Sequence, residues 1–356
     1  TPMDNDESVV GLETDGVANT NIIWHGGKLL ALEEGHAPFE LDPHTLESIG
    51  PHIYGGKLKG PMTAHPKIDP ENGEMLFFGY NANGTISEHM TFSVVDRDGK
   101  LLRSESFEAP YAAMVHDFVV TRDHVIFPIM PLTGSLERAF KGGPVYAWEP
   151  QKGSHIGIMP RNGSVKDLKW FRGEASYVFH PMNAFTGDDG KIVCDVCEYP
   201  EAPLFPGVDG QPGDPKKALA KLVRWTFDLN AQTDRYQVEQ LDDLVCEFPR
   251  LDERRAGLSY RFGYFAGDTQ PPEKVGGFNV IAAIDHQMGK LSSYDVGEGC
   301  ATSEPIFVPR SASCEEGDGF LLAYVFDANR AASHMAVLDA QNVADGPLAK
   351  AMLDHR

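Results

Sequence analysis

Short apolar runs bounded by turn residues recur along almost the whole chain. Three of them occupy residues 27–32, 73–79 and 319–327, and two neighbouring runs occupy 117–121 and 125–127. Apolar runs of this length, punctuated by Gly, Pro, Asn and Asp, are typical of β-strands. The clearest hairpin joins 90–95 to the residues after Lys100 through a turn that ends in Asp98-Gly99, a strong local signal for antiparallel pairing. The pattern therefore predicts a series of antiparallel strands.

Helical periodicity is nearly absent from the chain. The best helix candidate is the single short stretch 216–221, which runs into a predicted strand at 223–227. Repeated strand pairs without helices indicate a barrel, a sandwich or a propeller, and the spacing of the pairs suits propeller blades. No crisp repeat motif and no shift in composition divides the chain. We therefore expect residues 1–356 to form one all-β domain.

Composition and charge narrow the class of partner. Hydrophobic residues make up 42% and charged residues 23%, so the chain can bury a large core. The net charge of −21 argues against nucleic acid or an anionic membrane as a partner, since both would repel this surface. No apolar run is long enough to cross a bilayer, and no signal peptide is visible. We expect a cytoplasmic protein with a neutral or apolar small substrate and no membrane insertion.

The cysteines favour a reducing compartment. Their number is five, and an odd count in a long chain does not suggest a disulfide framework. Cys194 and Cys197 form a C-x-x-C, but the alternation of residues 192–196 indicates a strand in which cysteine serves as a small apolar residue. No second C-x-x-C is present to complete a zinc site.

Three of the thirteen histidines stand beside predicted strands in unusual settings, namely His65, His116 and His180. Separations of 51 and 64 residues place them on different blades, and blades bring side chains together at the axis of a propeller. A metal site is one interpretation; a structural, hydrogen-bonded role is the commoner one for any single histidine. Solvent exposure is expected for six others: His25, His36, His44, His52, His89 and His155.

Several short motifs follow one another in order along the chain: Val17-Ala18-Asn19-Thr20-Asn21, Leu41-Asp42-Pro43-His44, Ala64-His65-Pro66-Lys67, His116-Asp117-Phe118, Phe179-His180-Pro181-Met182-Asn183, Glu247-Phe248-Pro249-Arg250 and Glu304-Pro305-Ile306-Phe307. With these motifs the chain resembles the carotenoid cleavage oxygenases, and within them the lignostilbene dioxygenase and isoeugenol monooxygenase branch. The resemblance covers nearly the whole chain. It implies a seven-bladed β-propeller that carries Fe(II) on four histidines at its central axis.

The resemblance also implies which side chains hold the iron. Three ligands match His65, His116 and His180. The fourth belongs to a motif expected beyond Arg356, and His355 is not proposed as that ligand. On this comparison the chain is expected to lack N-terminal and C-terminal parts of the propeller.

Carboxylates that orient the histidines match Glu34, Glu247 and Glu304. A neutral imidazole that binds metal through one nitrogen must donate its other N–H, and a carboxylate fixes that tautomer. Each glutamate would otherwise be an exposed strand residue, an interpretation that fits poorly with Glu304 beside an apolar run. Thr20 matches a residue whose side chain crowds an open coordination position.

Two further residues bear on the substrate. Lignostilbene dioxygenases carry a lysine where this chain has Glu33, just before the first orienting glutamate. A carboxylate there would disfavour a phenolate and would accept a hydrogen bond from a neutral phenol. Phe179, next to His180, is a candidate wall of the substrate pocket, although core packing explains it equally well.

The resemblance predicts an Fe(II)-dependent oxygenase that cleaves a conjugated C=C bond with O2. A small 4-hydroxyphenyl alkene such as isoeugenol or 4-vinylguaiacol, giving vanillin, is the first choice of substrate. A stilbenoid or an apocarotenoid cleaved by the same chemistry is the alternative, and a propeller that serves only as a binding scaffold is a remote one. No Rossmann or P-loop glycine pattern calls for an organic cofactor. Assembly into a homo-oligomer is left open.

Overall fold

The computed structural model describes residues 16–270 and 277–353, and most of its regular structure is β-strand. The first sheets contain β1 (Asn21–His25), β2 (Lys28–Leu32), β3 (Phe39–Leu41), β4 (Ser48–Pro51), β5 (Lys67–Ile68), β6 (Met75–Gly79), β7 (His89–Val95), β8 (Leu101–Glu108), β9 (Val119–Val120), β10 (His124–Ile129), β11 (Leu132–Gly134), β12 (Tyr146–Trp148), β13 (Ser154–Pro160) and β14 (Lys169–Gly173). The later sheets contain β15 (Tyr177–Thr186), β16 (Ile192–Tyr199), β17 (Lys221–Phe227), β18 (Gln237–Leu251), β19 (Phe262–Asp268), β20 (Val280–Asp285), β21 (Lys290–Asp295), β22 (Cys300–Thr302), β23 (Ile306–Pro309), β24 (Gly319–Asp327), β25 (Ala332–Asp339) and β26 (Pro347–Met352).

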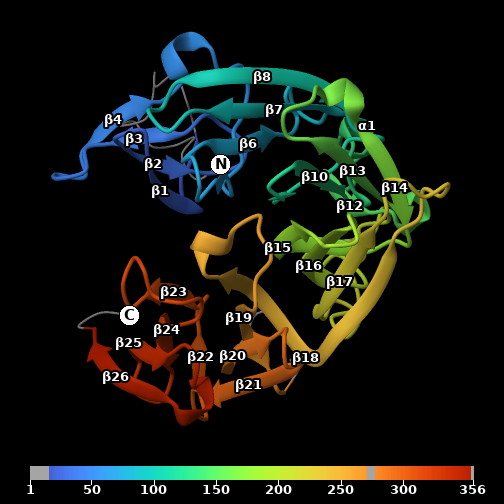
Figure 1. Ribbon diagram of the computed structural model, residues 1–356. Coiled ribbons are helices and arrows are strands. Elements are labelled where there is room, and N and C mark those ends of the chain that lie inside the picture. Colours follow the sequence, from blue (N-terminus) through green and yellow to red (C-terminus); the bar gives the residue numbers. More distant parts are fainter. Residues whose placement is uncertain (1–15, 271–276, 354–356) are drawn as a thin grey trace.

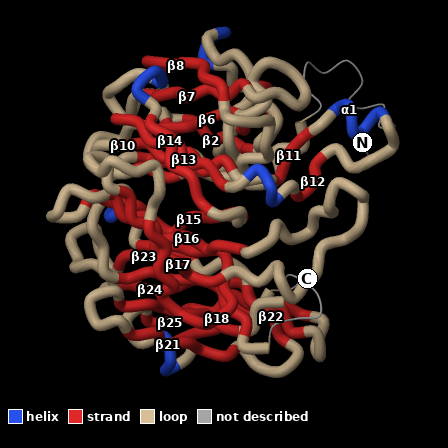
Figure 2. The backbone as a smooth tube through the Cα atoms, turned by 90° about the vertical axis from the view of Figure 1, so that its right-hand side faces the viewer, coloured by secondary structure: helices blue, strands red, loops and turns tan. Residues whose placement is uncertain are grey.

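Helices are short and few in the described residues. The α-helix α1 spans Leu136–Phe140 and is capped at its N-terminus by Ser135, whose side chain accepts a hydrogen bond from the backbone N–H of Arg138. The 3₁₀ turns are η3 (Tyr54–Gly56), η4 (Pro150–Lys152), η5 (Val165–Asp167), η6 (Glu253–Arg255) and η7 (Val343–Asp345). Figure 2 shows α1, β11 and β12 together on one face of the molecule. No helix in the described ranges is long and apolar enough to cross a membrane.

The sheets follow one another around a common centre in chain order, from β1–β4 through to β22–β26 (Figure 1). Every strand pair that joins neighbours within these sheets is antiparallel. The long strand β18 serves two units, because its first half pairs with β17 and its second half with β19. The result is an all-β, propeller-like ring, as the strand pattern predicted.

The hydrophobic core lies between neighbouring sheets rather than at the centre of the ring. In β6, Phe77 packs in the cluster shared with β2, whereas Phe78 packs in the cluster shared with β10. Successive residues of a strand point to opposite faces, so a strand covered on both faces must be apolar at every position. This explains why the sequence shows unbroken apolar runs such as Met75–Gly79, in which every residue is buried.

Most predicted strands are confirmed, and two local predictions are wrong. The hairpin at 90–100 forms as β7 and β8, and Cys194 is buried within β16. Residues 216–221, the best helix candidate, instead contain a turn that leads into β17. The stretch is too short to hold a helix by itself, and β17 gains ladder hydrogen bonds on both sides.

His25 was expected to be exposed, but it is buried in β1 with its ring beside the Gly73 carbonyl, 2.9 Å away. Burial of an imidazole is compensated here by that hydrogen bond to the backbone. The count of seven blades remains a prediction, since the described residues form six sheets of unequal size. His355 lies outside the described residues.

Candidate metal centre

Three segments from three successive sheets bring histidines to the middle of the ring. His65 lies just before β5 and His116 just before β9, while His180 lies within β15. Each of these strands is the end strand of its sheet. Around His180 the pairing of β15 with β16 shifts register on both sides of Pro181, and such bulges re-aim side chains. The convergence therefore follows from the ring topology together with a local bulge.

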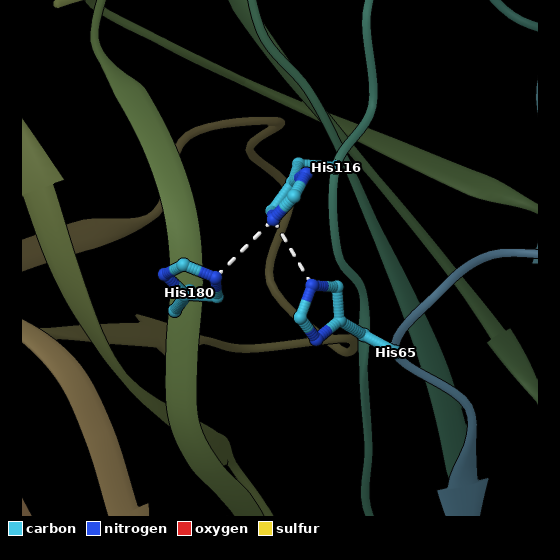
Figure 3. A group of neighbouring side chains, drawn as sticks. All are labelled: His65, His116 and His180. Carbon is cyan, nitrogen blue, oxygen red and sulfur yellow. Dashed lines mark hydrogen bonds between the residues drawn. The ribbon is translucent and has the colours of Figure 1, made fainter. Parts of the chain in front are cut away.

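The three imidazoles meet through their Nε2 atoms (Figure 3). The distance from His116 Nε2 is 3.0 Å to His65 Nε2 and 3.2 Å to His180 Nε2. One potential ligand atom from each histidine lies within 4.8 Å of the other two, and all three residues are half-buried. Within the described ranges, this is the group of His, Cys, Asp or Glu side chains whose geometry could hold a metal ion. A fourth histidine ligand remains a prediction.

Carboxylates on the far side of two rings fix which nitrogen carries the proton. The Glu34 carboxylate lies 2.8 Å from His116 Nδ1, and the Glu247 carboxylate lies 2.6 Å from His180 Nδ1. An ionised carboxylate only accepts, so each Nδ1–H donates and each neutral ring keeps a lone pair on Nε2. In the neutral form of the rings, which is the form that binds metal, two such lone pairs point toward each other across the 3.2 Å between the Nε2 atoms. A cation bound among the Nε2 atoms relieves this repulsion, so the donor set fits a metal ion.

Burial keeps His65 neutral. Loss of solvation, followed by the neighbouring His116 and His180, holds the pKa of the His65 imidazole far below its usual value. For His180, burial also disfavours the charged form, but the Glu247 carboxylate outweighs it and raises the pKa. Neutral imidazole is the form that binds metal, and a carboxylate behind it increases its basicity as a ligand.

An ion pair joins the segments that carry His65 and His116. Lys67 forms an ion pair with Asp117 at 2.8 Å, and the Asp117 side chain is only 4% exposed. The two partners follow His65 and His116 closely in sequence, so the pair ties the two ligand-bearing segments together across a sheet boundary. A cleft of about 580 Å³ is lined in part by His65 and His180.

Of the three glutamates predicted to orient the histidines, two hydrogen bond to a histidine and, within the described residues, one does not. Glu34 and Glu247 contact histidines, as described above. Glu304 lies between β22 and β23, lines the cleft, and pairs with Arg250 at 3.3 Å; its side chain is 40% exposed. The hydrogen bonds of the described residues join Glu304 to none of the three histidines. Its assignment as an orienting residue remains a prediction without a supporting contact.

Residues predicted to act on the substrate side occupy different settings. Phe179 meets His116 edge to face, with ring centroids 5.3 Å apart, so it forms part of the wall of the centre. The Glu33 carboxylate accepts hydrogen bonds from the Gly35 backbone and the His36 ring. Thr20 is exposed and its hydroxyl bonds to Asn19 Oδ1 at 3.3 Å. The sequence did not reveal the local partners of Glu33.

Two features of the centre were missed by sequence reasoning. The Lys67–Asp117 pair had a usable signal, because opposite charges follow two candidate ligands at short spacing. The second is Tyr80, whose hydroxyl donates to Glu34 Oε1 at 2.9 Å. Nothing in the sequence near Tyr80 indicates this contact, since the two residues lie 46 positions apart and follow strands of different sheets.

Comparison with known proteins agrees with the fold. The family model described as Retinal pigment epithelial membrane protein matches residues 1–356. Isoeugenol monooxygenase of Pseudomonas putida is 42% identical over 364 residues, covering 100% of this chain and 76% of that protein. Lignostilbene-alpha,beta-dioxygenase isozyme III of Sphingomonas paucimobilis is 37% identical, covering 100% and 75%.

Solved structures give the same picture. The crystal structure of Pseudomonas brassicacearum lignostilbene dioxygenase superposes with a TM-score of 0.92 at 37% identity, covering 97% of this chain and 74% of that one. A cobalt-substituted Synechocystis ACO superposes with a TM-score of 0.83 at 30% identity, covering 96% and 72%. The chain therefore belongs to the Retinal pigment epithelial membrane protein family of carotenoid cleavage oxygenases, in the branch that includes isoeugenol monooxygenase and lignostilbene dioxygenase, and it is an oxygenase.

Proposed function

We propose that this protein is a non-haem Fe(II)-dependent oxygenase that cleaves the conjugated C=C bond of a 4-hydroxyphenyl alkene with O2. Isoeugenol or 4-vinylguaiacol, giving vanillin, represents the substrate type. The observation that carries the proposal is the convergence of three Nε2 atoms, two of them on rings whose Nδ1 atoms face carboxylates. In the proposed full architecture the iron lies on the axis of a seven-bladed propeller.

The proposed ligands are His65, His116 and His180. Fe(II), when bound, supplies the activation of O2, which no side chain can provide by itself. Neutral histidines leave the +2 charge of the ion uncompensated among its ligands, and Glu34 and Glu247 balance it from one residue further out. The protein's own contribution is to orient the imidazoles and to keep the reacting alkene away from bulk water.

The aromatic residue Phe179 contributes to that exclusion of water. Its ring packs against His116, Tyr177 and Tyr199, which leaves an apolar surface beside the proposed ligands. An apolar wall suits the aryl or alkenyl part of the substrate, because contact with it removes apolar area from water. In the same proposal Thr20 crowds an open coordination position, and Glu33 disfavours a phenolate form of the substrate.

Support for the choice of substrate comes from the relatives. Two isoeugenol monooxygenases are 42% and 41% identical to this chain, whereas the lignostilbene dioxygenase of Sphingomonas paucimobilis is 37% identical. Relatives named for resveratrol and carotenoid cleavage have lower identity, at 35% and 33%. Stilbenoids and apocarotenoids are therefore the second candidates, with the same chemistry at the same centre.

The location and partners follow from the same proposal. We propose a cytoplasmic enzyme whose partners are a small aromatic alkene and O2. All five cysteines are free thiols, which supports a reducing compartment. No nucleic acid is proposed as a partner, because the net charge is −21.

An anaerobic Fe(II) titration followed by isoeugenol and air tests the proposal, with products identified by mass spectrometry. One iron per chain and an aldehyde product are expected. Iron bound without turnover of isoeugenol would redirect the substrate to stilbenoids and apocarotenals, which are then assayed in the same way. A protein that binds no stoichiometric iron would refute the metal centre and favour the scaffold alternative.

A further inference from the structure

The two carboxylates behind the histidines are held in different ways. Glu247 lies within β18, and its Oε2 atom accepts both from His180 Nδ1 and from the backbone N–H of Phe248, at 2.6 and 2.5 Å. Glu34 lies in the irregular segment after β2. One of its oxygens accepts from His116, and the other accepts from the Tyr80 hydroxyl at 2.9 Å. Glu34 is therefore held at both of its oxygens, whereas these two contacts of Glu247 share one oxygen.

Tyr80 is placed where its hydroxyl has little freedom. It follows the last residue of β6, is 8% exposed, and packs in the core cluster that contains Phe78 and Phe127. Burial, and then the Glu34 carboxylate, raise the pKa of the Tyr80 hydroxyl well above its usual value. The group therefore stays protonated and donates to Glu34, which as a carboxylate can only accept.

The contact links three sheets at the centre of the ring. Tyr80 follows β6 of the sheet β5–β8, Glu34 follows β2 of the sheet β1–β4, and His116 precedes β9, which pairs with β10. A carboxylate held at one oxygen can rotate about its last bond, whereas one held at both oxygens cannot. The direction of the His116 Nδ1–H bond, and with it the direction of the Nε2 lone pair, depends on where the accepting oxygen lies.

We propose that Tyr80 is a positioning residue of the metal centre, which fixes the Glu34 carboxylate by hydrogen bonding its second oxygen and thereby aims His116 Nε2 at the ion. This inference rests on the proposed metal function. It adds to that function a residue that touches neither the ion nor its ligands. Because Tyr80 acts through Glu34, its effect on metal binding should depend on whether Glu34 is a carboxylate.

The test uses Co(II) as the probe, titrated into metal-free protein and followed by its visible absorption. Tyr80→Phe removes only the hydroxyl oxygen and should weaken Co(II) binding about threefold to tenfold, with a changed cobalt spectrum. The expected loss is smaller than the roughly tenfold to hundredfold effect of losing the partner of a ligand histidine. Glu34→Gln supplies that larger effect as a reference.

A double-mutant cycle separates positioning from a general loss of stability. If Tyr80 acts through Glu34, Tyr80→Phe should have little effect on Co(II) affinity in a Glu34→Gln background. Tyr111→Phe is the matched control, because Tyr111 is also 8% exposed and its hydroxyl donates to two backbone carbonyls away from the centre. That variant should lose stability and bind Co(II) as the wild type does.

The outcomes are distinguishable. Wild-type protein that binds no Co(II) refutes the proposed metal centre itself. Wild-type binding with unchanged affinity and spectrum in Tyr80→Phe refutes the role of Tyr80 and leaves the metal centre standing. An effect of Tyr80→Phe that is equally large in the Glu34→Gln background, or that Tyr111→Phe reproduces, refutes action through Glu34.

Discussion

Replacing Glu247 by glutamine tests the electrostatic support of the metal centre with an almost isosteric change. The Glu247 side chain is 4% exposed, and its Oε2 atom accepts from His180 Nδ1 and from the Phe248 backbone. Its other oxygen, Oε1, is buried and accepts no hydrogen bond from the described residues. Glutamine can still accept from the histidine through its carbonyl oxygen. The negative charge is lost, and an amide NH2 is buried where Oε1 lies.

The expected magnitude follows from these contacts. Hydrogen bonds to an ionised acceptor are about twice as strong as neutral ones, so His180 loses much of its orientation and basicity. Imperfect pairing of the buried NH2 would cost up to about 1–3 kcal/mol of stability. Loss of the partner of a ligand histidine typically weakens metal binding about tenfold to hundredfold, equal to about 1.4–2.8 kcal/mol. We expect Glu247→Gln to fall in this range for Fe(II).

The assay is an anaerobic Fe(II) titration of wild type and Glu247→Gln at neutral pH, with isoeugenol turnover measured alongside. Glu316→Gln is the control. Glu316 is also a poorly exposed carboxylate, and it accepts from the backbone N–H groups of Arg261 and Phe262 at 2.6 and 3.0 Å. The control should lose stability and keep its iron affinity. Equal iron affinity in Glu247→Gln and wild type would falsify the reasoning.

Three further perturbations have expected outcomes of their own. His180→Ala should abolish stoichiometric Fe(II) binding and isoeugenol turnover while circular dichroism stays that of a folded β-protein; retained iron would contradict the ligand set. Phe78→Ala removes a fully buried ring between two sheets and should lower the free energy of unfolding by about 3–5 kcal/mol in urea, and a loss below about 1 kcal/mol would contradict the packing. Burial acts against the charge of Asp69, but hydrogen bonds from the Glu71 backbone and from Arg161 outweigh it and lower the pKa of its carboxyl below the usual 3.8. A lowered carboxyl pKa stabilises the fold above the usual value, and that stability is lost as the pH falls through the lowered one. Between pH 7 and pH 3, the free energy of unfolding of Asp69→Asn should therefore fall by less than that of the wild type. The same fall in both proteins, measured by urea titration at each pH, would contradict this role of Asp69.

Prediction from sequence succeeded for strands, whose formation depends on residues close together in the chain. Unbroken apolar runs bounded by turn residues identified strands such as β6 and β24, because a strand covered on both faces must be apolar throughout. The same reasoning failed at 216–221, where a few residues of helical character gave way to a turn and a strand. Local propensity is too weak over so few residues to outweigh the hydrogen bonds that β17 forms with its neighbours.

The site shows the same division. His65, His116 and His180 were selected by their sequence setting and by resemblance to a family, and the ring topology then brought them together. Glu304 was selected in the same way; its carboxylate pairs with Arg250, and its role toward the centre stays a prediction. Sequence alone could not choose between these results, because a side chain's partner depends on which strands lie beside it.

By itself, the sequence determined an all-β chain, an acidic surface and the residue types able to bind a metal, since these depend on composition and on spacing along one strand. Only the tertiary structure decided that Nε2 atoms from three sheets meet within a few ångströms. It also decided that Tyr80 donates to Glu34 across 46 positions of the chain. The physical reason is that such contacts join residues distant in sequence, and their geometry is set by how the sheets pack around the centre of the ring.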